Sequence, residues 1–415
     1  MSGPEKTNKF GGIGLAFADR NFRVYSYGSI GSWISFYVQL VAVSWLTWEL
    51  THSTTWLAIM GLMDIVPNVV LMPFAGALAD RIDRHKIMLV TSFLLLLQAG
   101  AMAVLAGYDQ LTLGPLAVLV LIHGILITFM VPAMLSTLPR FVDRGTLPTA
   151  LAVASSYSQL AIFAGPALAG WIISEHGLAL AFAVNAVGYL FLLLAFLALR
   201  TPVDYKQPAA SNHSFMRDII DGFVYIRRNV KFMSLLWLGL ISNMLVGAFY
   251  HMLPAYADQI LGKGLYGMST ILAAMGAGSV VAALWLAHGG VDTARTGRVI
   301  AATFVTLIAL AALSVTQNLY LAVVFAILVG IAAEMRGIAA KTIMQLLVSE
   351  SHRGRVMGTV FMLSELAIGI GTWIIGSLAA GHGLAIPMVI GVAVGLLLWL
   401  PVYLGRHKLM AEPDQ

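Results

Sequence analysis

Cysteine is absent from the 415 residues, and charged residues are scarce. The absence of cysteine excludes disulfide bonds and thiol chemistry. Asp, Glu, Lys and Arg make up only 10% of the chain and hydrophobic residues 59%, whereas a soluble domain has about 25% charged residues. The net charge of +5 is scattered among short loops, so it does not indicate nucleic-acid binding. The composition predicts an integral membrane protein.

The chain also lacks the motifs of an enzyme. It contains no nucleophile elbow, no HExxH metal spacing and no phosphate-binding loop, and its polar loops are too short for a catalytic domain. Residues 1–23 are polar and contain no apolar core before a cleavage site, so we expect no signal peptide. The sequence therefore predicts a protein that is not an enzyme and needs neither cofactor nor metal.

Apolar runs near 20 residues in length recur along the chain. This length suits α-helical spans better than the ten-residue alternating strands of a membrane barrel. With the N-terminus inside, 21 of the 24 Lys and Arg residues lie on the cytoplasmic side and only Lys263 lies outside, which predicts that both termini are cytoplasmic. The twelve predicted spans are residues 24–47, 54–78, 87–107, 113–138, 149–174, 178–199, 233–257, 266–288, 298–315, 319–345, 355–380 and 384–404.

The longest polar stretch separates six spans from six. Within it, apolar residues recur at helical spacing from Phe215 to Ile226, which predicts a short amphipathic helix on the inner membrane surface. Two six-helix halves with a site between them are typical of transporters. The predicted organisation is an N-terminal half (1–199), a cytoplasmic linker (200–232), a C-terminal half (233–404) and a tail (405–415).

A short charged segment separates the second and third spans. Six of the eleven residues from Gly76 to Lys86 are ionisable. The segment resembles the signature loop of the major facilitator superfamily, although Asp83 occupies the place of the second glycine. An ordinary positive-inside turn is the alternative interpretation. The matching residues, which we predict to form a gating loop, are Gly76, Asp80, Arg81, Arg84 and Lys86.

Three stretches carry a closer resemblance to the enterobactin-exporter and macrolide-efflux branch of this superfamily: 78–81, 165–170 and 353–358. The resemblance implies an all-α membrane protein with the major facilitator fold, twelve helices in two pseudo-symmetric halves. It also implies a monomer in the bacterial inner membrane that exports a small amphipathic or siderophore-like molecule, with the proton as coupling ion. The alternatives are a nutrient or metabolite importer of the same fold and a non-transporting assembly or receptor protein.

Ionisable residues inside the spans are candidates for function, because each costs about 2.5–3.5 kcal/mol to insert. Burial favours the protonated form of a carboxyl group, so one carboxylate is expected to carry the coupling proton. Glu365 and Asp64 lead, because neither has a basic neighbour within one turn of its own helix, and Glu334 follows. His123 and His251 are further titratable residues within the spans.

Structural ion pairs are the alternative role for these charges. Glu334 and Lys341 are seven residues apart and share a helix face, and Arg336 points elsewhere, towards Glu365. In this interpretation the charges lock the tenth and eleventh spans together. Family antiporters carry an acidic residue midway along the first helix, where this chain has Gln39.

The remaining candidates concern gating and the substrate cavity. Gly165, Pro166 and Gly170 predict a bend in the fifth span, with simple helix packing as the alternative. Asp80 is expected to latch onto the start of the eleventh span near Arg355. Residues at mid-depth that are predicted to line an amphipathic cavity, or alternatively to pack, include Tyr37, Gln39, Gln159, Asn243 and Trp373.

Overall fold

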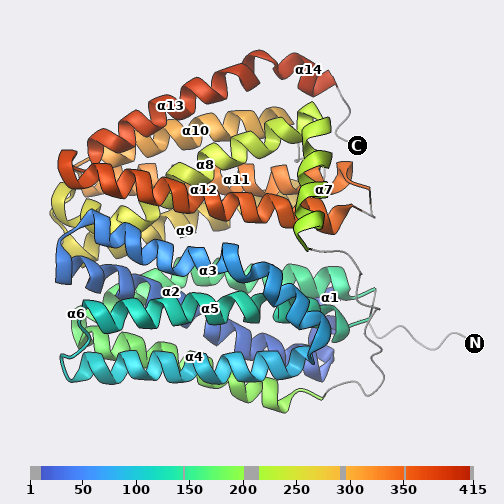
Figure 1. Ribbon diagram of the computed structural model, residues 1–415, viewed down its shortest axis with the longest axis vertical. Coiled ribbons are helices and arrows are strands. Elements are labelled where there is room, and N and C mark those ends of the chain that lie inside the picture. The colour runs from blue at the N-terminus through green and yellow to red at the C-terminus, as the bar shows by residue number, and fades with distance from the viewer. Residues whose placement is uncertain (1–10, 144, 201–214, 290–295, 350–351, 412–415) are drawn as a thin grey trace, which may run out of the picture. The chain divides into compact units, whose positions relative to one another are not determined.

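The computed structural model describes residues 11–143, 145–200, 215–289, 296–349 and 352–411, and all regular elements within these ranges are helices. Eleven of the described helices are long and apolar enough to cross a membrane (Figure 1). They are α2 (Arg20–Thr51), α3 (Thr54–Arg81), α4 (Arg84–Gly107), α5 (Leu113–Thr137), α6 (Leu147–Ala198), α8 (Val230–Ala255), α9 (Gly264–Gly289), α10 (Thr296–Val315), α11 (Leu319–Leu347), α12 (Arg353–His382) and α13 (Ala385–Leu404).

The helix α6 contains two spans. Its 52 residues would extend about 78 Å at 1.5 Å per residue, far more than the roughly 30 Å hydrocarbon core requires. The helix is interrupted at Gly177, whose φ of 81° and ψ of 176° are angles that glycine adopts without a steric penalty. The break lies between the predicted fifth and sixth spans, so the count of twelve spans is confirmed.

Five shorter elements complete the described chain. These are α1 (Gly11–Ala18), the 3-10 turn η1 (Leu138–Arg140), α7 (Phe215–Arg228), the π-helix η2 (Tyr256–Ile260) and α14 (Arg406–Ala411).

Side-chain caps mark several helix starts. Asp83, between α3 and α4, accepts a hydrogen bond from the backbone N–H of His85 at 2.9 Å. Its φ of −56° is open to any residue, so aspartate replaces the glycine of the family pattern without backbone strain. Asn318 caps α11 in the same way through the N–H groups of Tyr320 and Leu321.

The chain divides into two compact units. The first comprises residues 1–42 and 71–211, and in it α4 packs against α5 and α6 around a buried cluster that includes Met88 and Phe196. The second comprises residues 43–70 and 212–415, and in it α11 packs against α9 and α10, while α12 packs against α8. The end of α2 and the start of α3 are thus grouped with the second unit, and the predicted half boundaries stay a prediction.

Glycines allow the closest helix contacts in the second unit. A Cβ atom on Gly330 of α11 would overlap the carbonyl oxygen of Met275 on α9, and one on Gly278 of α9 would overlap the carbonyl oxygen of Ile327. Small residues at such contacts are the usual means of helix association in membranes, where the hydrophobic effect provides no force between helices. The pair α9 and α11 therefore packs backbone against backbone.

The predicted amphipathic helix is present as α7, which packs against α12 and α8 (Figure 1). Gly222 lies so close to Thr359 that a Cβ atom on it would overlap the threonine hydroxyl group. The ring of Tyr225 stacks on that of His352, with 5.1 Å between the ring centroids. Asp221 forms an ion pair with Arg355, 3.5 Å from Oδ2 to Nη1. Three different contacts thus fasten α7 to the first turns of α12.

Candidate functional site

Two carboxylates and a histidine meet inside the second unit. Asp64 of α3 interacts electrostatically with both His251 of α8 and Glu365 of α12. All three side chains are partly buried, and all three helices are membrane-spanning. We refer to these residues as the carboxylate cluster. Its components were predicted singly, but their association was not.

Helix packing explains how α3 and α12 bring Asp64 towards Glu365. Thr54 donates a hydrogen bond to the carbonyl oxygen of Gly376 at 2.8 Å. Further along, Gly369 leaves space for Ile65. Residue numbers therefore rise along α3 as they fall along α12, and this antiparallel register brings Asp64 to the level of Glu365.

Helices α8 and α12 run parallel, because Tyr225 of α7 contacts Phe232 at the start of α8 and His352 at the start of α12, and Met252 near the end of α8 lies against Gly376. Gly371 lies against the backbone of Met244, and Gly247 lies against Ile368. On α3, Gly61 makes room for the His251 ring, because a Cβ atom there would lie 2.8 Å from Nδ1. Close packing at glycines thus holds α3 and α8 near α12, and Asp64 is the residue that interacts with each of the other two.

Arg336 does not follow its predicted pairing with Glu365. Its side chain is 7% exposed, and Nη2 donates a hydrogen bond to Oδ1 of Asn243 on α8 at 2.7 Å. Helix α11, which carries Arg336, packs against α8, and α8 packs in turn against α12, which carries Glu365. The guanidinium group of Arg336 therefore meets α8 first. The Glu365 carboxylate has Asp64 as its electrostatic neighbour instead.

The other charges of α11 occupy different environments. Glu334 is partly buried and interacts electrostatically with Arg336, two residues along the helix. Lys341 has an exposed side chain. Asn243, predicted as a cavity residue, holds Arg336 in place, which gives the amide a structural role.

His123 and Gly165 have packing roles in the first unit. The His123 ring lies 3.2 Å from the hydroxyl oxygen of Tyr189 and stacks on Phe36. A Cβ atom on Gly165 would overlap Tyr37 of α2. Gly177 is the only residue of α6 with non-helical backbone angles, so the helix continues through Pro166 without a break. The contact at Gly165 fits the packing interpretation, and a bend at Gly165, Pro166 and Gly170 stays a prediction.

The predicted cavity residues are divided between the units. Gln39 of α2 is 4% exposed, and its Oε1 accepts no hydrogen bond from any described residue. Gln159 of α6 is partly buried, and Trp373 of α12 is 46% exposed. A buried amide oxygen without a partner costs about 1–3 kcal/mol, which makes Gln39 the strongest of these candidates. A shared cavity stays a prediction.

The gating-loop prediction is only partly covered by the structure. Gly76 belongs to α3, and Arg84 and Lys86 belong to the first turn of α4. The side chains of Asp80 and Arg81 lie outside the described residues. His85, within this loop, is held by a 2.8 Å contact between Nε2 and the carbonyl oxygen of Phe196. Arg355, the expected neighbourhood for Asp80, pairs with Asp221 of α7 within the second unit.

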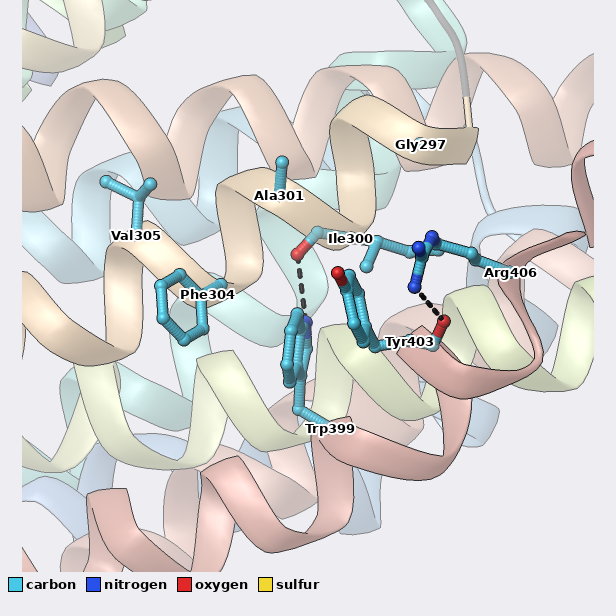
Figure 2. Close-up of a pocket in the computed structure, with 8 residues that line it drawn as sticks. All are labelled: Gly297, Ile300, Ala301, Phe304, Val305, Trp399, Tyr403 and Arg406. Atoms are coloured by element: carbon cyan, nitrogen blue, oxygen red, sulfur yellow. Dashed lines mark hydrogen bonds between the residues drawn. The ribbon is translucent and has the colours of Figure 1, made fainter.

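A pocket of about 450 Å³ lies between α10, α13 and α14, and Figure 2 shows its walls. None of the predicted site residues whose side chains the structure describes lines this pocket. Its volume is in the range of about 300–1,000 Å³ that small-molecule sites occupy. The lining residues are Gly297, Ile300, Ala301, Phe304 and Val305 of α10, Trp399 and Tyr403 of α13, and Arg406 of α14.

Comparison with known proteins identifies one family of membrane proteins. The family model described as transmembrane secretion effector matches residues 15–412. Macrolide efflux protein A of Streptococcus pyogenes is 24% identical over 213 residues, which are 51% of this chain and 50% of that protein, so the alignment spans half of that relative. The staphyloferrin A transporter of Staphylococcus aureus (strain NCTC 8325 / PS 47) is 22% identical over 336 residues, 80% of this chain and 82% of that protein.

The solved structures agree on the fold. A POT family transporter in complex with 5-aminolevulinic acid matches with a TM-score of 0.73 and 13% identity, over 94% of this chain and 97% of that one. At this identity the likeness concerns the fold alone. Because the family model covers almost the whole sequence, the chain belongs to the transmembrane secretion effector family of the major facilitator superfamily, whose members are transporters and not enzymes.

Proposed function

We propose that the chain exports small amphipathic molecules by alternating access and that the proton gradient drives the export. The names of the relatives, a macrolide efflux protein and a staphyloferrin A transporter, support a small-molecule substrate, and the word efflux in the first supports the outward direction. The carboxylate cluster is the observation that carries the proposal. Asp64 and Glu365 are carboxylates of different helices that interact inside the membrane-spanning part of the chain.

The chemistry of paired carboxylates suits a proton carrier. Two like charges in a low-dielectric site repel each other, so a state that holds one proton between them is favoured over the doubly ionised state. The imidazole of His251, which interacts with Asp64, offers a second group that exchanges protons. Asp64 lies on α3, while His251 and Glu365 lie on α8 and α12. A movement of α3 relative to the other two helices therefore changes the proton affinity of the cluster.

The energetics of such coupling are sufficient for export. Each pH unit across the membrane provides about 1.4 kcal/mol per proton, and the membrane potential adds about 2.3 kcal/mol per charge per 100 mV. One proton per cycle thus supports roughly a tenfold substrate gradient for each pH unit.

Flux measurement in proteoliposomes tests the proposed function. With an acidic lumen and inside-out orientation, we expect a labelled macrolide to accumulate in the lumen and a protonophore to abolish the accumulation. Staphyloferrin A serves as a second probe. Accumulation that persists with the protonophore would contradict proton coupling, and failure of both probes to move would contradict the proposed substrate class.

The proposed topology places both termini in the cytoplasm, and the absence of cysteine makes it easy to test. Tyr108→Cys, in an exposed position between α4 and α5, should react with an impermeant maleimide added to intact cells. Arg228→Cys, exposed at the end of α7, should react only after the membrane is opened. The reverse pattern would invert the assignment, and labelling of both sites in intact cells would refute the alternation of spans between them.

A further inference from the structure

We propose that the pocket between α10, α13 and α14 binds an anionic phospholipid. In this arrangement the phosphate group lies at Arg406 and an acyl chain lies against α10. The site is distinct from the carboxylate cluster, because α3, α8 and α12 contribute no lining residue to the pocket. In this proposal the lipid is a bound component of the membrane, separate from the transported molecule.

One wall of the pocket is a continuous aromatic stack that ends in a cation, as Figure 2 shows. The rings of Phe304 and Trp399 lie 5.0 Å apart, and those of Trp399 and Tyr403 lie 4.7 Å apart with an interplanar angle of 20°. The guanidinium carbon of Arg406 lies 4.0 Å from the centre of the Tyr403 ring. Trp399 is fixed by a 2.9 Å hydrogen bond from Nε1 to the carbonyl oxygen of Ile300.

The charge at the end of the stack remains available to a ligand. Within the part of the chain that the structure describes, Arg406 donates one hydrogen bond, from Nη1 to the carbonyl oxygen of Tyr403 at 3.2 Å, whereas a guanidinium group has five N–H donors. Stacking on Tyr403 orients the planar group, which leaves an edge suited to two oxygens of one phosphate. A zwitterionic head group also carries a phosphate, but its own cation opposes the cation of Arg406.

The α10 side of the pocket, to which Phe304 of the stack belongs, is apolar and exposed. On α10, Phe304 and Val305 have 40% and 42% of their surfaces exposed, within a helix of membrane-spanning length. Arg406 follows directly after the last span, and arginine side chains at span ends typically reach the level of the lipid head groups. At the same end of α10, Arg298 lies over the Trp285 ring at 5.0 Å, a second cation and aromatic pair typical of the interface. An amphipathic molecule with one negative end and an apolar chain matches this arrangement.

Native mass spectrometry of the full-length protein tests the proposal, with dioleoyl-phosphatidylglycerol and dioleoyl-phosphatidylcholine as the probes. We expect the wild type to retain one phosphatidylglycerol that phosphatidylcholine does not displace. Arg406→Gln should weaken the retention roughly tenfold, the effect of losing a charged hydrogen-bond donor. Ala301→Trp, which fills the apolar wall while keeping the charge, should weaken retention of the same lipid.

Arg227→Gln is the matched control, because it removes an exposed arginine from α7 at the same end of the second unit. This variant should retain phosphatidylglycerol as the wild type does. Equal retention of the two lipids by the wild type, or equal losses in the Arg406 and Arg227 variants, would overturn the proposal. Insensitivity to Ala301→Trp would show that only surface charge is involved and would also overturn it. Monomer and dimer masses in the same spectra report whether a second copy occupies the pocket instead, which would overturn it as well.

Discussion

Glu365→Gln is expected to abolish substrate accumulation driven by a pH gradient while substrate binding and passive exchange persist. Glutamine keeps the size and hydrogen-bonding capacity of the protonated side chain but cannot release a proton. It also removes the repulsion between Glu365 and Asp64, so the variant should fold as well as the wild type. Proteoliposome flux with and without an imposed pH gradient, together with thermal unfolding of the purified protein, measures both expectations.

Two further variants sharpen this experiment. Glu365→Asp keeps the titratable group and should retain partial activity with a shifted pH optimum. Glu175→Gln removes an exposed glutamate from α6, outside the carboxylate cluster, and should leave uphill transport unchanged. If Glu365→Gln still concentrates substrate against a pH gradient, Glu365 is not the proton carrier and Asp64→Asn becomes the decisive variant. If Glu365→Gln instead prevents folding, and adding Arg336→Gln restores it, the result would support the structural ion pair between Glu365 and Arg336 that was predicted from the sequence.

Gly330→Ala is expected to destabilise the protein by about 1–3 kcal/mol or more, the usual cost of overpacking. The added methyl group would overlap the carbonyl oxygen of Met275 on α9, which is a backbone atom and cannot relieve the overlap by changing rotamer. Restoring an acceptable distance requires the two helices to separate. The expected result is a lowered thermal unfolding temperature of the detergent-purified protein and a reduced yield from membranes.

Gly337→Ala is the matched control, two turns further along α11. Apart from the adjacent backbone of α11 itself, no described atom lies within 4 Å of a Cβ atom at this position, so the substitution should be neutral or slightly stabilising, since alanine favours helices over glycine. Equal unfolding temperatures for the two variants would show that α9 and α11 are less closely packed than described.

Much of the fold could be predicted from the sequence, because the signals for it are local. A membrane-spanning helix requires about 20 consecutive apolar residues, and this length is readable without knowledge of any neighbour. The break of α6 was also readable locally. It falls at Gly177, between two apolar runs, and glycine is the residue that adopts a positive φ without a steric penalty. Helix α7 was predictable because its apolar residues recur at helical spacing between charges.

The candidate site was less predictable because its residues come from three helices. A soluble helix reveals its buried face by an apolar stripe, but a membrane span is apolar on all sides, so periodicity does not indicate which neighbour a residue meets. Arg336 was therefore assigned to Glu365 on charge alone, whereas it bonds to Asn243. The glycines at positions 61, 247 and 369 were the available signal, since each permits a close contact near the carboxylate cluster.

The docking of α7 has a consequence for how the protein responds to its bilayer. Ile220, Phe223 and Val224 are 54%, 42% and 40% exposed, whereas Ile226 is buried. Because α7 is fixed to the start of α12, these apolar side chains stand at a set height relative to the spans of the second unit. With α7 at its predicted place on the inner membrane surface, a tilt of those spans would lift the side chains out of the interface or push them deeper, and both displacements would cost free energy. Through this attachment, bilayer thickness would influence the tilt of the spans of the second unit.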